Sequence, residues 1–148
     1  MPPILVSACL LGLQSRYDGR SKRNEKVFSY LAQHDLTPVP VCPEQLAGLP
    51  TPRPASRFAC GDGERVLAGT GSVVNAADND MTDVFIQGAR ETLKIARLCG
   101  CTQALLKERS PSCGVHQVYL GDSIIEGQGV ACALLRQEGL HVCSEEDL

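Results

Sequence analysis

The sequence predicts an α/β fold: a mostly parallel β-sheet flanked by helices, with a β-hairpin excursion. Short apolar runs of strand length, such as ILVSA (4–8), alternate along the chain with amphipathic stretches of helical spacing. The clearest of these stretches, 82–99, carries one apolar stripe and is followed by Gly100. Because strands that alternate with helices form βαβ units, and 148 residues is a common size for one domain, we expect a single Rossmann-like domain over residues 1–148.

The predicted strands are short and leave room for helices between them. The run 36–41 contains Pro38 and Pro40, which cannot donate a hydrogen bond within a sheet, so we expect it at an edge. Residues 65–77 are expected to form a hairpin with Gly-Thr-Gly as its turn. The segment 118–127 is expected to be a second hairpin or an irregular excursion. The other strands are predicted at 4–8, 102–107 and 140–144.

Capping signals set the expected ends of the helices. Ser21 is a possible N-cap for the first helix and Thr82 for the second. Gly100 fits the left-handed residue that ends many helices, and Gly139 stops the third. A proline-rich loop is expected at 42–56. The three helices are predicted at 21–35, 82–99 and 129–138.

Composition argues against several classes of function. The net charge is −3, and the single basic cluster, RSKR (20–23), is expected to be the exposed first turn of a helix; duplex binding needs a clear excess of Lys and Arg. The amino-terminal residues lack a basic region and a small-residue cleavage site, and no apolar run approaches the roughly 20 residues that span a bilayer. We therefore expect a cytoplasmic protein that binds neither nucleic acid nor membrane. Its oligomeric state cannot be read from the sequence.

Three of the eight cysteines share one position relative to the predicted strands. Cys9, Cys42 and Cys113 each follow the end of a strand, and parallel strands bring their carboxyl ends to one edge of the sheet, where ligands bind. A reducing compartment argues against disulfides, so we expect these thiols to meet at a metal site. Three thiolates leave a tetrahedral metal one ligand short, which is typical of catalytic sites. Zinc and one iron of a cubane cluster both fit this arrangement.

The other five cysteines fit this rule less well, and a buried cysteine often serves as a small hydrophobic residue. The last of them ends the final strand, which makes it a competitor for a fourth ligand position. His116 is a second competitor, because it forms a C-x-x-H pair with Cys113. The five are Cys60, Cys99, Cys101, Cys132 and Cys143.

Polar residues close to the three cysteines in sequence are candidates for chemistry. Glu44 lies in CPEQ, and a carboxylate at the edge of a metal site is a suitable general base for water. Ser110 and Ser112 flank a proline; they act either as turn residues or as a proton donor and a hydrogen-bond partner for substrate. Lys107 and Arg109 place positive charge at the same edge, although surface solvation explains them equally well.

Five segments, in order, resemble the thiouracil desulfidase family. They are ILVSACLLG, RYDGRSKRNEKV, PVCPEQLAGLPTPRP, LKERSPSCG and GQGVACALLRQEG…VCSEEDL, and they run nearly end to end. The resemblance implies one thiouracil-desulfidase-like domain over 1–148 and a [4Fe–4S] cluster held by Cys9, Cys42 and Cys113, with the fourth iron open to substrate. It also implies that Glu44 and Ser110 take part in catalysis.

Membership of these motifs adds residues that we expect to bind substrate: Asp18, Asn24, Lys107 and Ser112. The sequence departs from the family in the CLLGxxC stretch, where many relatives carry a second cysteine and this chain has Ser15. The change removes a spare thiol and leaves the three predicted ligands in place.

The resemblance implies hydrolytic removal of sulfur from thiouracil or a related thiolated pyrimidine, with release of hydrogen sulfide and no net redox change. A soft thiocarbonyl sulfur prefers a thiolate-ligated iron, which withdraws electron density from the C=S bond. Glu44 would deprotonate the attacking water, and Ser110 would assist proton transfer. Which thiolated base or nucleotide is used stays open.

Three alternatives stay open at this point. A mononuclear zinc hydrolase would use the same three cysteines and would contain zinc without sulfide. A non-enzymatic iron–sulfur sensor or carrier would need a fourth protein ligand, such as Cys143 or His116. Sulfur transfer through one reactive thiol would proceed in metal-free protein.

Overall fold

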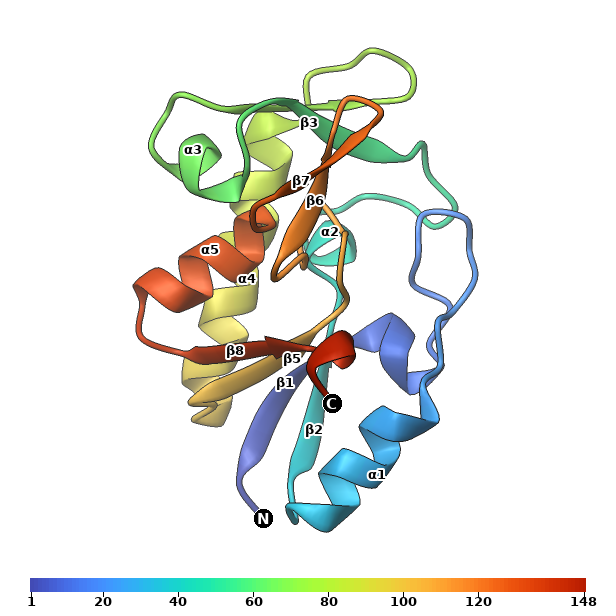
Figure 1. Ribbon diagram of the computed structural model, residues 1–148, viewed down its shortest axis with the longest axis vertical. Coiled ribbons are helices and arrows are strands. Elements are labelled where there is room, and N and C mark those ends of the chain that lie inside the picture. The colour runs from blue at the N-terminus through green and yellow to red at the C-terminus, as the bar shows by residue number, and fades with distance from the viewer.

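A four-stranded parallel sheet forms the lower half of the molecule in Figure 1. The computed structural model describes all residues, 1–148. The strand order is β2-β1-β5-β8, and all three pairings are parallel, which confirms the predicted mostly parallel sheet. The two-proline strand β2 lies at an edge, as expected. The strands are β1 (Pro3–Ser7), β2 (Thr37–Val41), β5 (Gln103–Leu106) and β8 (His141–Ser144).

The chain changes direction across this sheet at β1. It passes from β1 through α1 (Glu25–Gln33) to β2 on one side, and later returns to place β5 on the other side of β1. Ligands of open α/β sheets bind at such a switch point, in the crevice outside the carboxyl ends of the strands. The ends of β1, β2 and β5 are therefore the expected place for a site.

Helices cover both faces of the parallel sheet. The helix α1 packs on one face through Val27 and Leu31, whereas Leu93 of α4 and Leu135 of α5 are buried against the other. A sheet covered on both faces needs apolar residues on both sides of each strand, which explains why β1 is a continuous apolar run. None of the helices combines the length and the apolar character needed to cross a membrane. The two further helices are α4 (Thr82–Cys99) and α5 (Val130–Gln137).

A second four-stranded sheet lies beyond the carboxyl ends of the first (Figure 1). It is built from two excursions of the chain: one between β2 and α4, and one between β5 and α5. Its order is β4-β3-β6-β7, with antiparallel pairs at both ends and a parallel contact between β3 and β6. The strands are β3 (Ser56–Cys60), β4 (Ser72–Asn75), β6 (Gln117–Leu120) and β7 (Ser123–Glu126).

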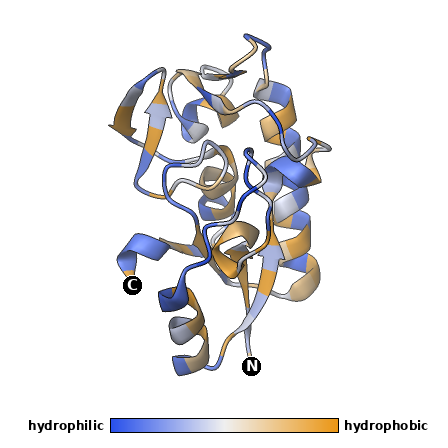
Figure 2. Cartoon of the chain, turned by 90° about the vertical axis from the view of Figure 1, so that its right-hand side faces the viewer, coloured by the Kyte–Doolittle hydropathy of each residue, from blue (hydrophilic) through white to orange (hydrophobic).

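The long helix α4 joins the two sheets. Its first half buries Phe85 and Ala89 in the apolar cluster of the second sheet, and its second half buries Leu93 and Ala96 in that of the first. Figure 2 shows hydrophobic and hydrophilic residues alternating along the helices. The helix α4 therefore packs against both sheets and holds them together.

The predicted hairpin at 65–77 is wrong. Residues Gly63–Leu67 form a short helix, α3, because the Asp62 side chain caps it by accepting a hydrogen bond from the backbone N–H of Arg65. The strand β4 pairs with β3 instead. Short apolar runs such as Val-Leu do not distinguish a strand from a helix by period alone. The second candidate hairpin, 118–127, is present as β6 and β7.

The helix α1 begins later than expected. Its N-cap is Asn24 and not Ser21, and the Asn24 side chain accepts a hydrogen bond from the backbone N–H of Lys26 at 2.9 Å. Asparagine and serine both accept a hydrogen bond from a free N–H group at the start of a helix, so the sequence pattern did not distinguish Asn24 from Ser21 as the N-cap.

The helix α4 has its predicted bounds, and Gly100 ends it with φ of 72°. Thr82 does not cap it. The Thr82 hydroxyl instead accepts from the backbone N–H of Val73 at 3.0 Å and donates to Asp80 at 2.6 Å, which ties α4 to β4. Within the predicted proline-rich loop lies a further one-turn helix, α2 (Pro43–Leu46).

Candidate active site

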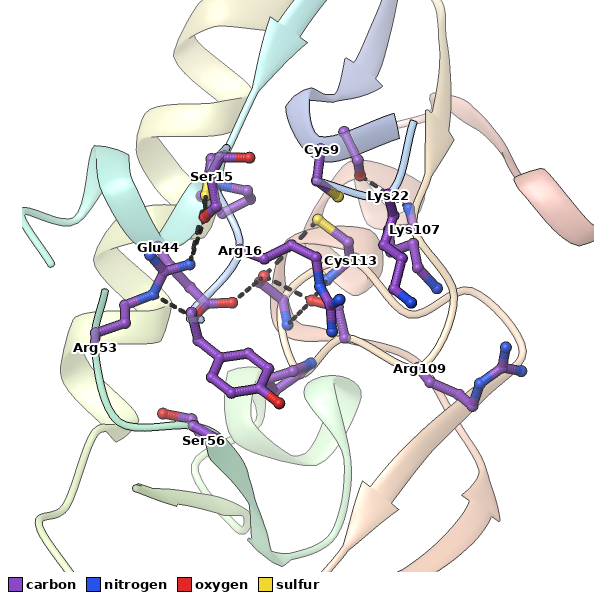
Figure 3. A pocket seen from close by; sticks show the side chains of 18 of the residues that line it. Cys9, Ser15, Arg16, Lys22, Glu44, Arg53, Ser56, Lys107, Arg109 and Cys113 are labelled. Atoms are coloured by element: carbon purple, nitrogen blue, oxygen red, sulfur yellow. Dashed lines mark hydrogen bonds and ion pairs between the residues drawn. The ribbon is translucent and has the colours of Figure 1, made fainter. Parts of the chain in front are cut away.

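A cavity of about 550 Å³ lies at the carboxyl ends of β1, β2 and β5. Its walls come from these strand ends, from the short helix η1 (Ala8–Leu11), from α2, from the loop between β5 and β6, and from the second sheet. Three cysteines line it, Cys9, Cys42 and Cys113, and no histidine does. The folded chain therefore brings together the three thiols that follow strand ends. Figure 3 shows the side chains of Cys9 and Cys113 pointing toward one another.

The strand register explains why the thiols meet. Ser7 of β1 is paired with Val41 of β2, so the next residues of both strands leave the sheet at the same level. Cys9 then lies in η1, and Cys42 is the residue before α2. The end of β5 is fixed beside β1 because the Ser7 hydroxyl accepts a hydrogen bond from the backbone N–H of Lys107 at 2.9 Å.

All three thiols have a raised pKa. Burial raises the pKa of Cys9 to about 11, opposed by the charge of Lys107 and increased further by Cys42. Burial likewise raises the pKa of Cys42 and of Cys113, whose thiol is also influenced by both other cysteines. A nucleophilic thiolate needs a lowered pKa, so this environment argues against thiol-based sulfur transfer. Thiols of this kind lose their protons when a metal binds them.

The spacing of the thiols distinguishes two kinds of metal site. No group of three or more His, Cys, Asp or Glu side chains in this structure could hold a single metal ion. With Zn–S bonds of about 2.3 Å, one tetrahedral ion would draw its thiolates to within about 4 Å of one another. In a cubane cluster each thiolate binds a different iron, so the sulfurs stand farther apart. The arrangement therefore fits a cluster better than a mononuclear zinc site.

Neither expected competitor for the fourth ligand position lies in the cavity. The Nε2 atom of His116 contacts the Asp147 carboxylate at 2.9 Å in a separate hollow. Cys143, on β8, packs against the apolar cluster under α1. Because the cavity offers no further thiol or imidazole, a carrier with four such protein ligands is not supported.

Glu44 lies on α2, in the wall of the same cavity, and its side chain is 12% exposed. Its Oε1 atom accepts a hydrogen bond from Nε of Arg53 at 3.1 Å, and Oε2 accepts one from the Ser112 hydroxyl at 3.1 Å. Both oxygens of the carboxylate are thus held in place. A positioned carboxylate beside a cavity of this kind can take a proton from water.

Two serine hydroxyls form a chain of hydrogen bonds that donates toward Glu44. The Ser110 hydroxyl accepts from the backbone N–H groups of Ser112 at 3.2 Å and of Cys113 at 3.0 Å. Its own hydrogen is then free to donate to the Ser112 oxygen, 3.0 Å away, and Ser112 donates in turn to Glu44. Ser112 therefore contacts the carboxylate directly, and Ser110 is connected to it through Ser112.

The cavity is more basic than the sequence suggested for a chain of net charge −3. Only Glu44 and Glu108 are acidic among the residues that line it. Part of the signal was the basic cluster 20–23, which we interpreted as the exposed first turn of a helix; it precedes α1, and Lys22 lines the cavity. The basic lining residues are Arg16, Lys22, Arg53, Arg57, Lys107 and Arg109.

Comparison with known proteins agrees with this site. The model of the 2-thiouracil desulfurase family matches residues 4–147. The chain belongs to this family. The [4Fe–4S]-dependent thiouracil desulfidase TudS has a similar structure, with a TM-score of 0.84 and 39% sequence identity over 100% of this chain and 93% of the TudS chain. The Bacillus subtilis (strain 168) protein YbbK, described as uncharacterised, is 40% identical over 98% of this chain and 97% of its own length.

Two of the four residues that the sequence predicted to bind substrate line the cavity. Lys107 lies beside Cys9, and Ser112, which is 2% exposed, contacts Glu44. Asp18 and Asn24 do not line it. Asp18 shapes its own loop, whereas Asn24 caps α1.

Glu108 shapes the loop of this family member that carries both serines and the third cysteine. Its Oε1 atom accepts hydrogen bonds from the backbone N–H groups of Val115 at 2.8 Å, His116 at 2.8 Å and Gln117 at 3.0 Å. Burial raises the pKa of Glu108, but these backbone hydrogen bonds outweigh it and hold the pKa below its usual value. Glu108 thus closes the loop by joining its first residues to its last.

Replacing Glu108 with Gln is expected to lower the free energy of unfolding by about 1.5–3 kcal/mol at neutral pH, because the three backbone hydrogen bonds to Oε1 lose their charged acceptor. The amide would also occupy the place of Oε2, which is buried without a partner. Since the pKa of Glu108 is lowered by folding, its contribution is present above the unfolded pKa of about 4.3 and is lost as the pH falls through the folded value.

Urea unfolding of wild type and Glu108→Gln at neutral pH and at acidic pH would measure this effect. The difference between the two proteins should shrink as the pH falls. Glu64→Gln, at an exposed position, is the matched control and should change stability by less than about 0.5 kcal/mol. A difference that is constant with pH would contradict the assigned role.

Gly129 lets the start of α5 touch the same loop. A Cβ atom at this position would overlap the backbone carbonyl of Ser112 and lie 2.7 Å from the backbone nitrogen of Cys113. We expect Gly129→Ala to displace the loop, at a cost of about 1–3 kcal/mol in stability, and to reduce both turnover and iron content. Thermal unfolding and iron analysis, with Gln137→Ala on the exposed side of α5 as control, test this. Wild-type values for Gly129→Ala would show that the loop does not need this close contact.

Proposed function

We propose that this chain is a [4Fe–4S]-dependent desulfidase that hydrolyses thiouracil or a related thiolated pyrimidine and releases hydrogen sulfide. The observation that carries the proposal is one cavity in which three thiols from three strand ends face a positioned carboxylate. The family match and the similarity to TudS support the same activity.

Cys9, Cys42 and Cys113 would hold the cluster. All three line the cavity, their arrangement fits a cluster better than a single shared ion, and burial raises the pKa of each thiol. When bound, the cluster supplies a soft Lewis acid that attracts the thiocarbonyl sulfur and withdraws electron density from the C=S bond.

Glu44 is the proposed base. Its carboxylate takes a proton from the water that attacks the thiocarbonyl carbon, and Arg53 and Ser112 hold both of its oxygens in place. The Ser110 hydroxyl donates to Ser112, and Ser112 donates to Glu44, so Ser110 would assist proton transfer by keeping the carboxylate charged and oriented toward the water. The C–S bond is replaced by a C–O bond, both protons of the water end on sulfide, and no electrons are gained or lost.

The walls of the cavity bind and shield the substrate in this proposal. Lys107 and Ser112 are the substrate-binding candidates that line it; Asp18 and Asn24 would act only through the shape of their loop. The cavity between the two sheets brings the reacting groups together.

We further infer that residues 1–148 act as one domain in the cytoplasm, without a nucleic-acid partner. Both sheets contribute to the cavity, and α4 is buried against both, which supports a single unit.

Protein prepared without oxygen provides the decisive test. We expect iron and acid-labile sulfide in the ratio of a cubane cluster, and conversion of thiouracil to uracil with one sulfide released for each base. Zinc without sulfide would overturn the cluster. Cluster-containing protein that leaves 2-thiouracil, 4-thiouracil and their nucleotides unchanged would overturn the activity.

A further inference from the structure

The side chain of Arg53 is 4% exposed, and all five of its N–H donors have a partner. Burying a guanidinium is costly unless its donors are satisfied, so full pairing explains how the charge is tolerated. Such a side chain has one orientation and little freedom. Its contacts are Nε to Glu44 at 3.1 Å, Nη1 to the Pro50 carbonyl at 3.3 Å and the Thr51 hydroxyl at 2.9 Å, and Nη2 to the Ser15 carbonyl at 2.9 Å and Cys42 Sγ at 3.9 Å.

These contacts link separate parts of the cavity wall. The guanidinium joins the loop after η1 to the residues before and within α2, and it does so from the segment that leads into the second sheet. Figure 3 shows Arg53 between Ser15 and Glu44, with dashed lines to both. Two of its partners, Glu44 and Cys42, are the proposed base and a proposed cluster ligand.

We propose that Arg53 is a positioning residue that holds the Glu44 carboxylate at a set distance from the metal centre and donates a hydrogen bond to the Cys42 sulfur. The proposal rests on the proposed function for its effect on turnover. The geometry behind it is one rigid, planar group whose adjacent Nε and Nη2 atoms contact the carboxylate and the sulfur.

A lysine cannot reproduce this arrangement. Its ammonium is a single point on a flexible stem, so it can neutralise Glu44 but cannot contact Glu44, the Ser15 carbonyl and Cys42 in one fixed plane. Arg53→Lys therefore keeps the positive charge and removes the geometry, whereas Arg53→Gln removes both.

The hydrogen bond to Cys42 has a consequence that does not depend on turnover. Donors to the sulfurs of an iron–sulfur cluster stabilise its more negative, reduced form and raise its reduction potential. Loss of the Nη2 contact is thus expected to lower the potential. A residue that only supported the fold would leave the potential unchanged in a protein with full cluster content.

The test compares Arg53→Lys and Arg53→Gln with wild type, with the exposed Arg90→Gln as the matched control. Each protein is prepared without oxygen and assayed for iron, sulfide, reduction potential, and kcat and KM for thiouracil. In both Arg53 variants we expect a lower potential and a kcat reduced about 10- to 100-fold with little change in KM, as for other residues that orient metal ligands. Arg90→Gln should match wild type.

Wild-type kcat and potential in Arg53→Lys would overturn the proposal. If neither variant takes up the cluster, Arg53→Ala with added guanidinium decides the question: recovery of cluster uptake with guanidinium, and not with sodium chloride, supports it, and no recovery overturns it. The potential is measured without substrate. A lowered potential in a protein whose wild type shows no desulfidase activity would therefore overturn the proposed function and leave the Cys42 contact established.

Discussion

Replacing Glu44 with Gln is expected to lower kcat by about 100- to 10,000-fold, the usual contribution of a general base. The amide has the shape of the carboxylate but cannot accept a proton from water. The side chains that contact Glu44 are Arg53 and Ser112, so no neighbouring carboxylate could replace it as the base. Sulfide release and the loss of thiouracil absorbance measure the effect. Iron content and the visible spectrum should match wild type, because Glu44 is not a proposed cluster ligand.

The matched control is Glu91→Gln, which removes an ion-paired carboxylate on α4 away from the cavity. It should retain wild-type turnover. Near-normal activity in Glu44→Gln would show that another group is the base. Loss of iron from Glu44→Gln would show that Glu44 is needed for cluster binding.

The second large effect is expected at the cysteines. Cys113 is 5% exposed, and Cys113→Ser would replace a soft sulfur ligand with a hard hydroxyl at a site that has no spare thiol. We expect loss of most iron and sulfide and no measurable turnover; Cys9→Ser and Cys42→Ser should behave in the same way. Iron and sulfide analysis together with the visible spectrum provide the measurement.

Cys60→Ser and Cys99→Ser serve as controls, because both thiols are exposed and neither lines the cavity. Both variants should contain wild-type iron. Full cluster content in Cys113→Ser would contradict the proposed ligand set, and loss of the cluster from a control would move the site elsewhere.

Several features of the fold follow from local rules. Apolar runs and helical stripes predicted the parallel sheet and the bounds of α4, because these patterns are long or regular enough to be decisive. Pro38 and Pro40 predicted the edge position of β2, because neither can donate a hydrogen bond within the sheet. The error at 65–77 came from a short run, where a capping aspartate outweighed the β-rich composition.

The same rules selected the three thiols. Their positions after strands predicted that Cys9, Cys42 and Cys113 would share one edge of a sheet, and the cavity contains all three. This inference needed only the parallel direction of the strands, which the sequence pattern contains.

The remaining parts of the site depend on contacts between segments that are distant in the chain. The sequence by itself determined which thiols and which carboxylate come to the carboxyl edge of the sheet, because the ends of the strands and their alternation with helices are encoded in local patterns. Only the tertiary structure decided that Ser112 contacts Glu44 and that Arg53 is buried against both Glu44 and Cys42. Hydrogen-bond partners depend on separations and angles set by packing, and no pattern along one chain specifies those.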